Sequence, residues 1–321
     1  MGNPPFKITS KILNLCVSIA GLLGELAGLK VSKPQVVLRK ENQIKTIQAS
    51  LAIEGNTLSL EQVTDIVDGS PVMGPSKDLL EVQNAIKVYD SFSKFKYSSE
   101  QHLKNAHKIM MNNLTMGVGD YRSGNVGIFA GSNVTHVAPQ PKMVPKLMRE
   151  LFAFINKKDD ISLLVKACIF HYELEFIHPF SDGNGRMGRL WQQVILTKYH
   201  EIFSYMAIES LIKDKQAKYY QVLSDCDKQG DSTLFVEFSL KLIETSLKNH
   251  LDEMKYEPKT PFDRIAYAKA RIESKFTRKD YIKVFRDIST ATASRDLKFG
   301  VEQSLLSKSG DKNSTTYEFI G

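Results

Sequence analysis

The sequence is poor in cysteine, and this scarcity excludes several classes of protein. Only three cysteines occur in 321 residues, Cys16, Cys168 and Cys226. An odd number, without the short paired spacing of metal ligands, argues against a disulfide framework and against a zinc site. It favours a reducing compartment, so we expect a cytoplasmic protein. Internal repeats and low-complexity segments are also absent from the sequence.

Long hydrophobic runs are lacking as well. The apolar run of residues 12–23 is interrupted by Asn14 and Ser18, whereas a membrane span needs roughly 20 apolar residues. Two lysines precede the run, as they would in a signal peptide, but residues 24–30 offer no small-x-small cleavage site. We therefore expect an N-terminal core helix here and no membrane partner.

What is present is the composition of an ordinary globular protein. Apolar residues make up 42% of the chain and charged residues 25%, which is enough to bury a core. At this length two or three packed units are expected. The net charge of +7 suits a polyanionic ligand or partner, although the charge is spread over the whole chain.

Apolar residues at helical spacing dominate the chain, so we predict a mainly α fold. A helix over 36–53 should stop at Gly55, and Ser59 can cap the next helix, which begins near Leu60. Between residues 121 and 137, glycines and β-branched residues alternate, which predicts a short β-hairpin. Further helices are expected at 77–93, 99–112, 143–157, 163–176 and 187–199, with two or three more up to residue 254.

The end of the chain forms a separate small unit in this interpretation. Residues 256–261 have the composition of a linker, and residues 262–321 carry 12 Lys and Arg against 8 Asp and Glu, a net charge of +4. Two helices, 278–286 and 290–299 with Gly300 at the C′ position, precede two strands, 304–308 and 315–320. This order predicts a winged helix-turn-helix domain that binds DNA or docks a protein. Its candidate recognition residues are Thr290, Thr292, Ser294, Arg295 and Lys298.

One stretch, His178-Pro-Phe-Ser-Asp-Gly-Asn-Gly-Arg-Met-Gly-Arg189, concentrates the chemically active side chains. A residue before proline is pushed out of the right-handed α region, so the preceding helix should stop near His178. The imidazole of His178 can take a proton near neutral pH. Asp182 offers carboxylate oxygens of the kind that hold Mg²⁺ against phosphate oxygens.

The rest of this stretch is suited to holding an anion. Gly183 and Gly185 let the backbone approach a phosphate closely, and Asn184 between them can donate an amide N–H. Arg186 and Arg189 are three residues apart on a first helical turn and are expected on one side, where they can grip terminal phosphates. The combination predicts a phosphate-handling active site rather than a plain helix–loop–helix connection.

The stretch resembles the signature of the Fic family, His-Pro-Phe-x-Asp/Glu-Gly-Asn-Gly-Arg-x-x-Arg, and matches it at each fixed position. The similarity extends from the hairpin at Tyr121 to about residue 250, and it implies a Fic-type helical core with a small β-hairpin flap. Members of this family mostly transfer AMP from ATP to a protein hydroxyl and release pyrophosphate. The resemblance therefore implies an enzyme, a protein adenylyltransferase that uses ATP and Mg²⁺.

The same resemblance implies roles for individual residues. His178 would deprotonate the Ser, Thr or Tyr hydroxyl, Asp182 would hold Mg²⁺ on the α- and β-phosphates, and Arg189 would engage the γ-phosphate. The ATP-binding set would comprise Asp182, Gly183, Asn184, Gly185, Arg186, Met187, Gly188, Arg189, Tyr219 and Tyr220. The flap that docks a target strand would comprise Asn133, Val134, Thr135, His136 and Val137.

A second motif lies far upstream. Ser50 and Glu54 are four residues apart on one predicted helix, about 36–54, and therefore face the same way. Ser50-Leu-Ala-Ile-Glu54-Gly55 resembles the inhibitory motif of the Fic family. The resemblance implies that Glu54 pairs with Arg189 and so excludes a productive γ-phosphate.

These interpretations give three parts: 1–98 with the inhibitory helix, 99–254 with the catalytic core and following helices, and 262–321 with the winged helix. The expected partners are ATP, a target protein with a hydroxyl side chain, the chain itself, a second copy in a homodimer, and DNA or a protein at 262–321. Three alternatives stay open. They are a DNA-binding transcriptional regulator, a de-AMPylating hydrolase on the same fold, and transfer of another nucleotide or of phosphocholine.

Overall fold

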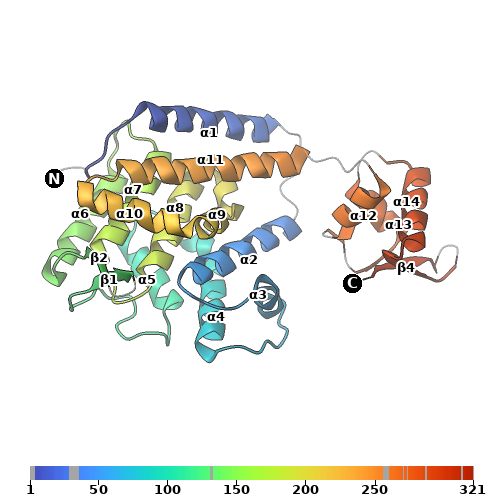
Figure 1. Ribbon diagram of the computed structural model, residues 1–321, viewed down its shortest axis with the longest axis horizontal. Coiled ribbons are helices and arrows are strands. Elements are labelled where there is room, and N and C mark those ends of the chain that lie inside the picture. The colour runs from blue at the N-terminus through green and yellow to red at the C-terminus, as the bar shows by residue number, and fades with distance from the viewer. Residues whose placement is uncertain are drawn as a thin grey trace. The chain divides into compact units, whose positions relative to one another are not determined.

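The computed structural model describes residues 4–28, 36–130, 133–255, 260–269, 271–272, 274–285, 288–311 and 314–320. The chain divides into two compact units, residues 1–251 and 252–321, each with its own elements (Figure 1). Helices make up most of the described chain, and strands are few and short. The predicted mainly α fold is confirmed.

The first unit consists of helices and one hairpin. Its α-helices are α1 (Ser10–Gly28), α2 (Val36–Ile53), α3 (Leu60–Val67), α4 (Ser76–Asp90), α5 (Glu100–Met110), α6 (Val144–Asn156), α7 (Leu163–Ile177), α8 (Asn184–Tyr199), α9 (Ile208–Asp214), α10 (Gln216–Gln229) and α11 (Thr233–Lys255). Its strands are β1 (Gly127–Ala130) and β2 (Asn133–Val137), and short 3-10 helices lie at 92–94, 141–143 and 201–205.

Helix α7 is the centre of this unit. Twelve of its fifteen residues are buried, and its sequence is apolar on nearly every side. It packs most extensively against α8, and α6 covers another side. Trp191 of α8 has no exposed surface, and its indole Nε1 donates to the carbonyl of Tyr97 at 3.0 Å. Since α7 and α8 flank the residue 178–183 connection, their packing fixes the ends of that loop.

The N-terminal helix α1 lies alongside α11 (Figure 1). By length and composition α1 is apolar enough to cross a membrane, a test that core helices of other folds also pass. Polar contacts bind it to α11: Lys11 pairs with Glu237 at 2.9 Å, and the Ser18 hydroxyl donates to Glu244 at 2.6 Å. Its buried residues are Ile12, Leu15, Ile19, Leu22, Leu23 and Leu26, so the predicted N-terminal helix packs by its apolar side.

Helix α2 ends where the sequence predicted. Its last residue is Ile53, and Gly55 adopts a left-handed φ of 90°, which glycine reaches without steric cost. Helix α3 then begins with Ser59 as its N-cap. The Ser59 side chain accepts from the backbone of Gln62 while the Gln62 side chain accepts from the backbone of Ser59, a capping box.

The predicted hairpin is also present. Strands β1 and β2 pair antiparallel from Gly127 with Val137 to Ala130 with Asn133, and the register shifts at Ile128/Phe129. Because the shift inserts an extra residue on β2, the hairpin is locally bent. The side chains of residues 127–137 lie outside the described part of the structure.

The second unit combines helices α12 (Pro261–Lys269), α13 (Arg278–Val284) and α14 (Thr290–Glu302) with strands β3 (Lys275–Phe276), β4 (Leu306–Ser309) and β5 (Thr316–Phe319). The strands form an antiparallel sheet in the order β3-β5-β4. The two predicted helices and two predicted strands are present, and α12 and β3 were not expected from the sequence. Most of the predicted linker, residues 256–259, lies outside the described residues.

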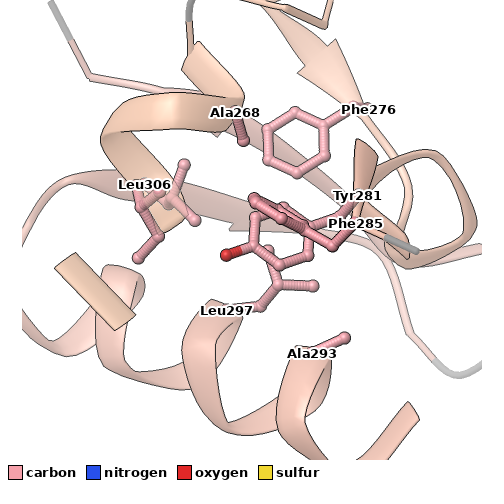
Figure 2. Close-up of a cluster of buried hydrophobic side chains, with 8 residues drawn as sticks. Ala268, Phe276, Tyr281, Phe285, Ala293, Leu297 and Leu306 are labelled. Atoms are coloured by element: carbon pink, nitrogen blue, oxygen red, sulfur yellow. The ribbon is translucent and has the colours of Figure 1, made fainter. Parts of the chain in front are cut away.

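A small apolar core holds this unit together (Figure 2). Its labelled members come from all three helices and from β3 and β4, and they are Ala268, Phe276, Tyr281, Phe285, Ala293, Leu297 and Leu306. The prediction that Gly300 ends its helix is wrong, since α14 continues to Glu302. A Cβ on Gly300 would come within 2.7 Å of Leu306 and 2.8 Å of Ile265, so this glycine permits close packing instead.

Candidate active site

The connection between α7 and α8 begins with a left-handed residue. His178 is the C-cap of α7 with φ 50° and ψ 59°, so the helix stops where the His-Pro step predicted. A non-glycine residue in this region is sterically unfavourable and persists only when its surroundings hold it. Arg122 supplies that hold, because its guanidinium donates to the carbonyls of His178 at 2.7 Å and Ile177 at 3.3 Å, and to two further carbonyls in the adjoining loop. Sequence reasoning missed this role of Arg122.

The imidazole of His178 is half-buried, and its Nδ1 lies 3.3 Å from the carbonyl oxygen of Glu175. A carbonyl oxygen only accepts, so Nδ1 carries the proton in this contact. In the neutral ring the lone pair is then on Nε2. His178 is therefore prepared to accept a proton at Nε2.

Helix α8 begins with an uncapped N-terminus. Gly183 is its N-cap with φ 82°, and no side chain among the described residues caps it. The Asn184 side chain instead crosslinks the loop. It accepts from the Phe180 N–H and donates to the Phe180 carbonyl, each at 2.9 Å. Any anion contact from Asn184 is thus limited to its backbone N–H. The backbone donors of this first turn, with the helix dipole behind them, favour an anion.

His107, a buried histidine of α5, supports the connection between α7 and α8. His107 stacks on Phe180 with ring centroids 3.7 Å apart, and its Nε2 lies 3.0 Å from the carbonyl oxygen of Asp182. The backbone N–H of Gly119 donates to Nδ1 at 2.9 Å, so Nε2 must carry the proton. Burial lowers the pKa of His107, which keeps the ring neutral in this arrangement. Its sequence position gave no sign of this role.

Asp182 projects to solvent beside the helix N-terminus. Its side chain is 51% exposed, and its Oδ1 accepts from the Gly183 N–H at 2.6 Å and from Arg186 at 3.3 Å. Within the described part of the chain no donor reaches the second carboxylate oxygen, which leaves it for another ligand. One exposed carboxylate facing a phosphate site suits Mg²⁺, which keeps most of its waters and binds few protein groups.

The two arginines of α8 are both buried, but they face different partners. Arg186 is 4% exposed and donates to Glu81 of α4 at 3.0 Å, in addition to Asp182. Glu81 also accepts from the side chain of Asn56 at 2.8 Å, so Arg186 ties the loop after α2 to the catalytic loop. The two arginines were expected to bind phosphate from one side. In the structure Arg186 faces the carboxylate of Glu81, and Arg189 faces a different carboxylate.

Arg189 is held by the helix of the second motif. Its Nη2 donates to Glu54 Oε1 at 2.8 Å and to the Ser50 carbonyl at 3.0 Å, and its Nε donates to the Ser50 hydroxyl at 3.0 Å. Burial alone would lower the pKa of Arg189, but the charge of Glu54 raises it, so the guanidinium stays charged. The structure therefore brings together residues that are 135 positions apart in the sequence.

The Glu54 carboxylate also lies directly over the predicted anion site at the first turn of α8, residues 183–186. A Cβ built on Gly185 would collide with Glu54 Oε1 and would lie 3.1 Å from the Arg189 guanidinium. The carboxylate thus occupies the space between the first turn of α8 and Arg189. An anion already fills the place where the sequence predicted phosphate.

Helices α9 and α10 hold α2 in this position. The side chains of Gln216 and Tyr220 donate to the carbonyl of Ile53, at 2.9 Å and 3.4 Å, at the C-terminus of α2. Thr46 of α2 is hydrogen-bonded to Glu209 of α9, whose pKa is raised to about 7 by burial. These contacts flank the Glu54–Arg189 pair on the α2 side.

The other predicted site residues differ in how deeply they are buried. Met187 is completely buried, and Gly188 has no room for a Cβ because His171 lies 2.8 Å from that point. Tyr219 is 1% exposed and its hydroxyl donates to Glu175, whereas Tyr220 is 44% exposed. The flap residues 133–137 form β2, and their side chains lie outside the described part.

Comparisons with known proteins identify the family to which this fold belongs. The model of the Fic/DOC family matches residues 97–196. The crystal structure of a Fic family protein from Desulfovibrio desulfuricans G20 is 36% identical and superposes with a TM-score of 0.74, covering 100% of this chain and 99% of that one. The chain belongs to the Fic family.

Curated relatives carry an activity in their names. Protein adenylyltransferase Fic from Aedes aegypti is 29% identical over 225 residues, 66% of this chain and 42% of that protein. Protein adenylyltransferase fic-1 from Caenorhabditis briggsae is 27% identical over 251 residues, 74% of this chain and 47% of that protein. The chain thus spans somewhat less than half the length of the curated relatives it matches.

Proposed function

We propose that the protein is an adenylyltransferase that moves AMP from ATP to a hydroxyl group of a target protein and of itself. The observation that carries this proposal is the anion site between the first turn of α8 and Arg189, bordered by His178 and Asp182. The names of the curated relatives support the same activity. The three cysteines are free thiols, which fits the reducing, cytoplasmic compartment expected from the sequence.

In the proposed reaction Nε2 of His178 takes the proton of the target hydroxyl. The hydroxyl oxygen attacks the α-phosphorus and forms the new P–O bond, while the bond to the β-phosphate oxygen breaks and pyrophosphate leaves. The backbone N–H groups of Gly183–Arg186 hold the phosphate oxygens, and Arg189 binds the γ-phosphate. Positioning and neutralisation of charge by these groups supply most of the acceleration.

Asp182 would hold Mg²⁺ on the phosphates of bound ATP, since one oxygen of its exposed carboxylate accepts from no donor among the described residues. The ion would neutralise charge on the phosphates. Arg186 would act mainly on the loop itself, because Glu81 and Asp182 already bind its guanidinium.

We further propose that Glu54 inhibits the enzyme. Arg189 can bind the carboxylate of Glu54 or the γ-phosphate of ATP, and the two anions require the same space above Gly185. With Glu54 in place, ATP either fails to bind or binds with its α-phosphate displaced from His178. The contacts of α9 and α10 with α2 favour the inhibited state.

The test is intact-mass spectrometry of the full chain incubated with ATP and Mg²⁺. The Glu54→Gly variant should gain one or more AMP groups, and the His178→Ala/Glu54→Gly variant should gain none. Mass added by both variants would reject His178 as the base. If a modified target loses AMP faster in the wild type than in Glu54→Gly, the alternative of de-AMPylation is favoured.

For residues 262–321 we propose a winged helix that binds duplex DNA. The order α12-β3-α13-α14-β4-β5 matches that class, and α14 carries an exposed stripe of Ala291, Arg295 and Lys298 opposite its buried side. Arg278 at the start of α13 donates to Ser294 of α14 at 3.0 Å, which adds a third cation beside the stripe. Small residues and cations together suit a groove lined by phosphates.

Fluorescence anisotropy of the full chain with a mixed-sequence duplex tests this second function. We expect binding that weakens steeply with salt and is reduced about tenfold or more by Arg295→Ala/Lys298→Ala. The control pair Lys94→Ala/Lys158→Ala removes equal charge from the first unit and should have little effect. No binding at low salt would leave a protein partner as the ligand of this unit.

A further inference from the structure

Helix α7 carries a buried polar network next to its C-cap residue, His178. His171 and Glu175 are spaced i, i+4 on one side of α7, and the C-cap His178 follows Glu175 by three residues. Glu175 is only 8% exposed. Its Oε1 accepts from the Tyr219 hydroxyl at 3.4 Å and lies 3.7 Å from Nε2 of His171.

The network is anchored on several helices. His171 Nδ1 lies 2.6 Å from the Gln192 side-chain oxygen, and Gln192 donates to the Ser239 hydroxyl at 2.6 Å. The Tyr219 hydroxyl lies 3.1 Å from His171 Nε2. Residues of α7, α8, α10 and α11 therefore fix the position of the Glu175 carboxyl group.

The carboxyl group is also pressed against the phosphate-binding helix. A Cβ on Gly188 would lie 3.0 Å from Glu175 Oε1, so the carboxylate touches the α8 backbone between Arg186 and Arg189. The main-chain carbonyl of the same residue receives the Nδ1 proton of His178. Glu175 thus contacts the base through its backbone and the second turn of α8 through its side chain.

Charge keeps this buried acid ionised. Burial raises the pKa of Glu175, but the hydrogen bond with His171 and the charges of His171, His178 and Arg189 lower it below its ordinary value. Among the described residues, the charged and titratable side chains that interact with it also include Tyr219 and Tyr220 of α10. Because electrostatic interaction is reciprocal, a carboxylate stabilised by a cationic His178 stabilises that cation in return.

We propose that Glu175 is a positioning residue whose buried carboxylate increases the proton affinity of His178 and stabilises the imidazolium that forms when His178 takes the hydroxyl proton. It acts by its charge, in the low-dielectric core next to the site. The kinetic consequence rests on the proposed AMP transfer, while the effect on His178 itself does not depend on it. No part of the Fic signature includes this position.

An NMR titration of the His178 imidazole in the full chain tests the proposal directly, with the signal assigned by its loss in His178→Ala. In Glu175→Gln we expect the midpoint to move to lower pH by about 0.5–1 unit, because one buried negative charge near the imidazole is lost. Glu175→Asp keeps the charge and should retain most of the wild-type midpoint. Tyr219→Phe removes a hydrogen bond but no charge, and it serves as the matched control.

An unchanged midpoint in Glu175→Gln would overturn the proposal, and so would equal shifts in the Gln and Asp variants, since packing rather than charge would then be the cause. Glu175→Met, apolar and of similar length, replaces the Gln variant if that protein does not fold. In the Glu54→Gly background the acidic limb of the kcat/KM profile should move to lower pH with the KM for ATP unchanged. If the parent transfers no AMP, the proposed function fails while the titration still decides the role of Glu175.

Discussion

The guanidinium of Arg189 lies 2.8 Å from the Glu54 carboxylate, yet the two side chains differ in exposure: 1% for Arg189 and 27% for Glu54. A buried cation that loses its anion is strongly destabilised, so Arg189 needs a partner at all times. In the proposed mechanism the partially exposed Glu54 leaves without opening the core, and the γ-phosphate of ATP takes its place. The asymmetry suits a switch in which the arginine is fixed and the anion is exchanged.

In the proposed inhibition the hydroxyl of Ser50 helps to hold Arg189, because it accepts from Arg189 Nε at 3.0 Å. Removing it by Ser50→Ala weakens the hold on Arg189 by about one hydrogen bond, while the Glu54 contact stays. We expect AMP transfer to rise about two- to tenfold. Steady-state transfer assays measure this, with Lys45→Ala on the exposed side of α2 as the control. A loss of activity in Ser50→Ala would contradict an inhibitory role.

Arg186 stabilises the fold through Glu81. Arg186→Ala would leave the Glu81 carboxylate buried without its main cation, and we expect unfolding to become easier by about 3–5 kcal/mol. Lys77 also faces Glu81, at 4.0 Å, but its side chain is 72% exposed. Lys77→Ala should therefore change stability very little. Denaturant titration compares the two, and equal losses would show that Arg186 acts as a surface charge.

His107 makes the loop sensitive to acid. Since its pKa is lowered in the folded protein, the unfolded chain binds more protons below about pH 6.5, the ordinary value for histidine. Its contribution to stability is full above that pH and is lost as the pH falls toward the folded value. His107→Gln should therefore destabilise the protein more at pH 7.5 than at pH 5.5. Denaturant titrations of the wild type and His107→Gln at both pH values measure this, and an equal loss of stability at the two pH values would contradict it.

Gly300 is tightly packed inside α14. A methyl group there meets Leu306 at 2.7 Å and Ile265 at 2.8 Å, so Gly300→Ala should cost about 1–3 kcal/mol in the second unit. Gly21→Ala on α1 meets nothing within 4 Å and should stabilise by roughly 0.5–1 kcal/mol through helix propensity. Thermal unfolding distinguishes the two. Stabilisation by Gly300→Ala would show that the helix relaxes to accept it.

Much of this architecture follows from local patterns. The end of α7 at His178, the end of α2 before Gly55 and the cap at Ser59 each depend on a few adjacent residues, so the sequence predicts them. Gly300 was misassigned because a glycine near a helix end has two physical causes, a left-handed turn and close packing. Only the positions of Leu306 and Ile265 distinguish them.

The parts of the site that escaped prediction are those made by long-range contacts. Arg122 and His107 lie 56 and 75 positions from the loop groups they bind, and neither belongs to a recognisable motif. Arg186 and Arg189 have the same sequence environment, but α4 offers a carboxylate to one and α2 offers a carboxylate to the other. Which carboxylate each arginine meets is decided by the packing of α2 and α4.

The central claim is that Glu54 and the γ-phosphate compete for Arg189. The most direct measurement is the rate of AMP incorporation from α-labelled ATP by the wild type and by Glu54→Gly, with Glu54→Gly/Arg189→Ala alongside. The competition predicts a rise of about tenfold or more in Glu54→Gly, about 1.4 kcal/mol for each factor of ten, and its loss in the double variant. Equal rates in the wild type and Glu54→Gly would contradict the account.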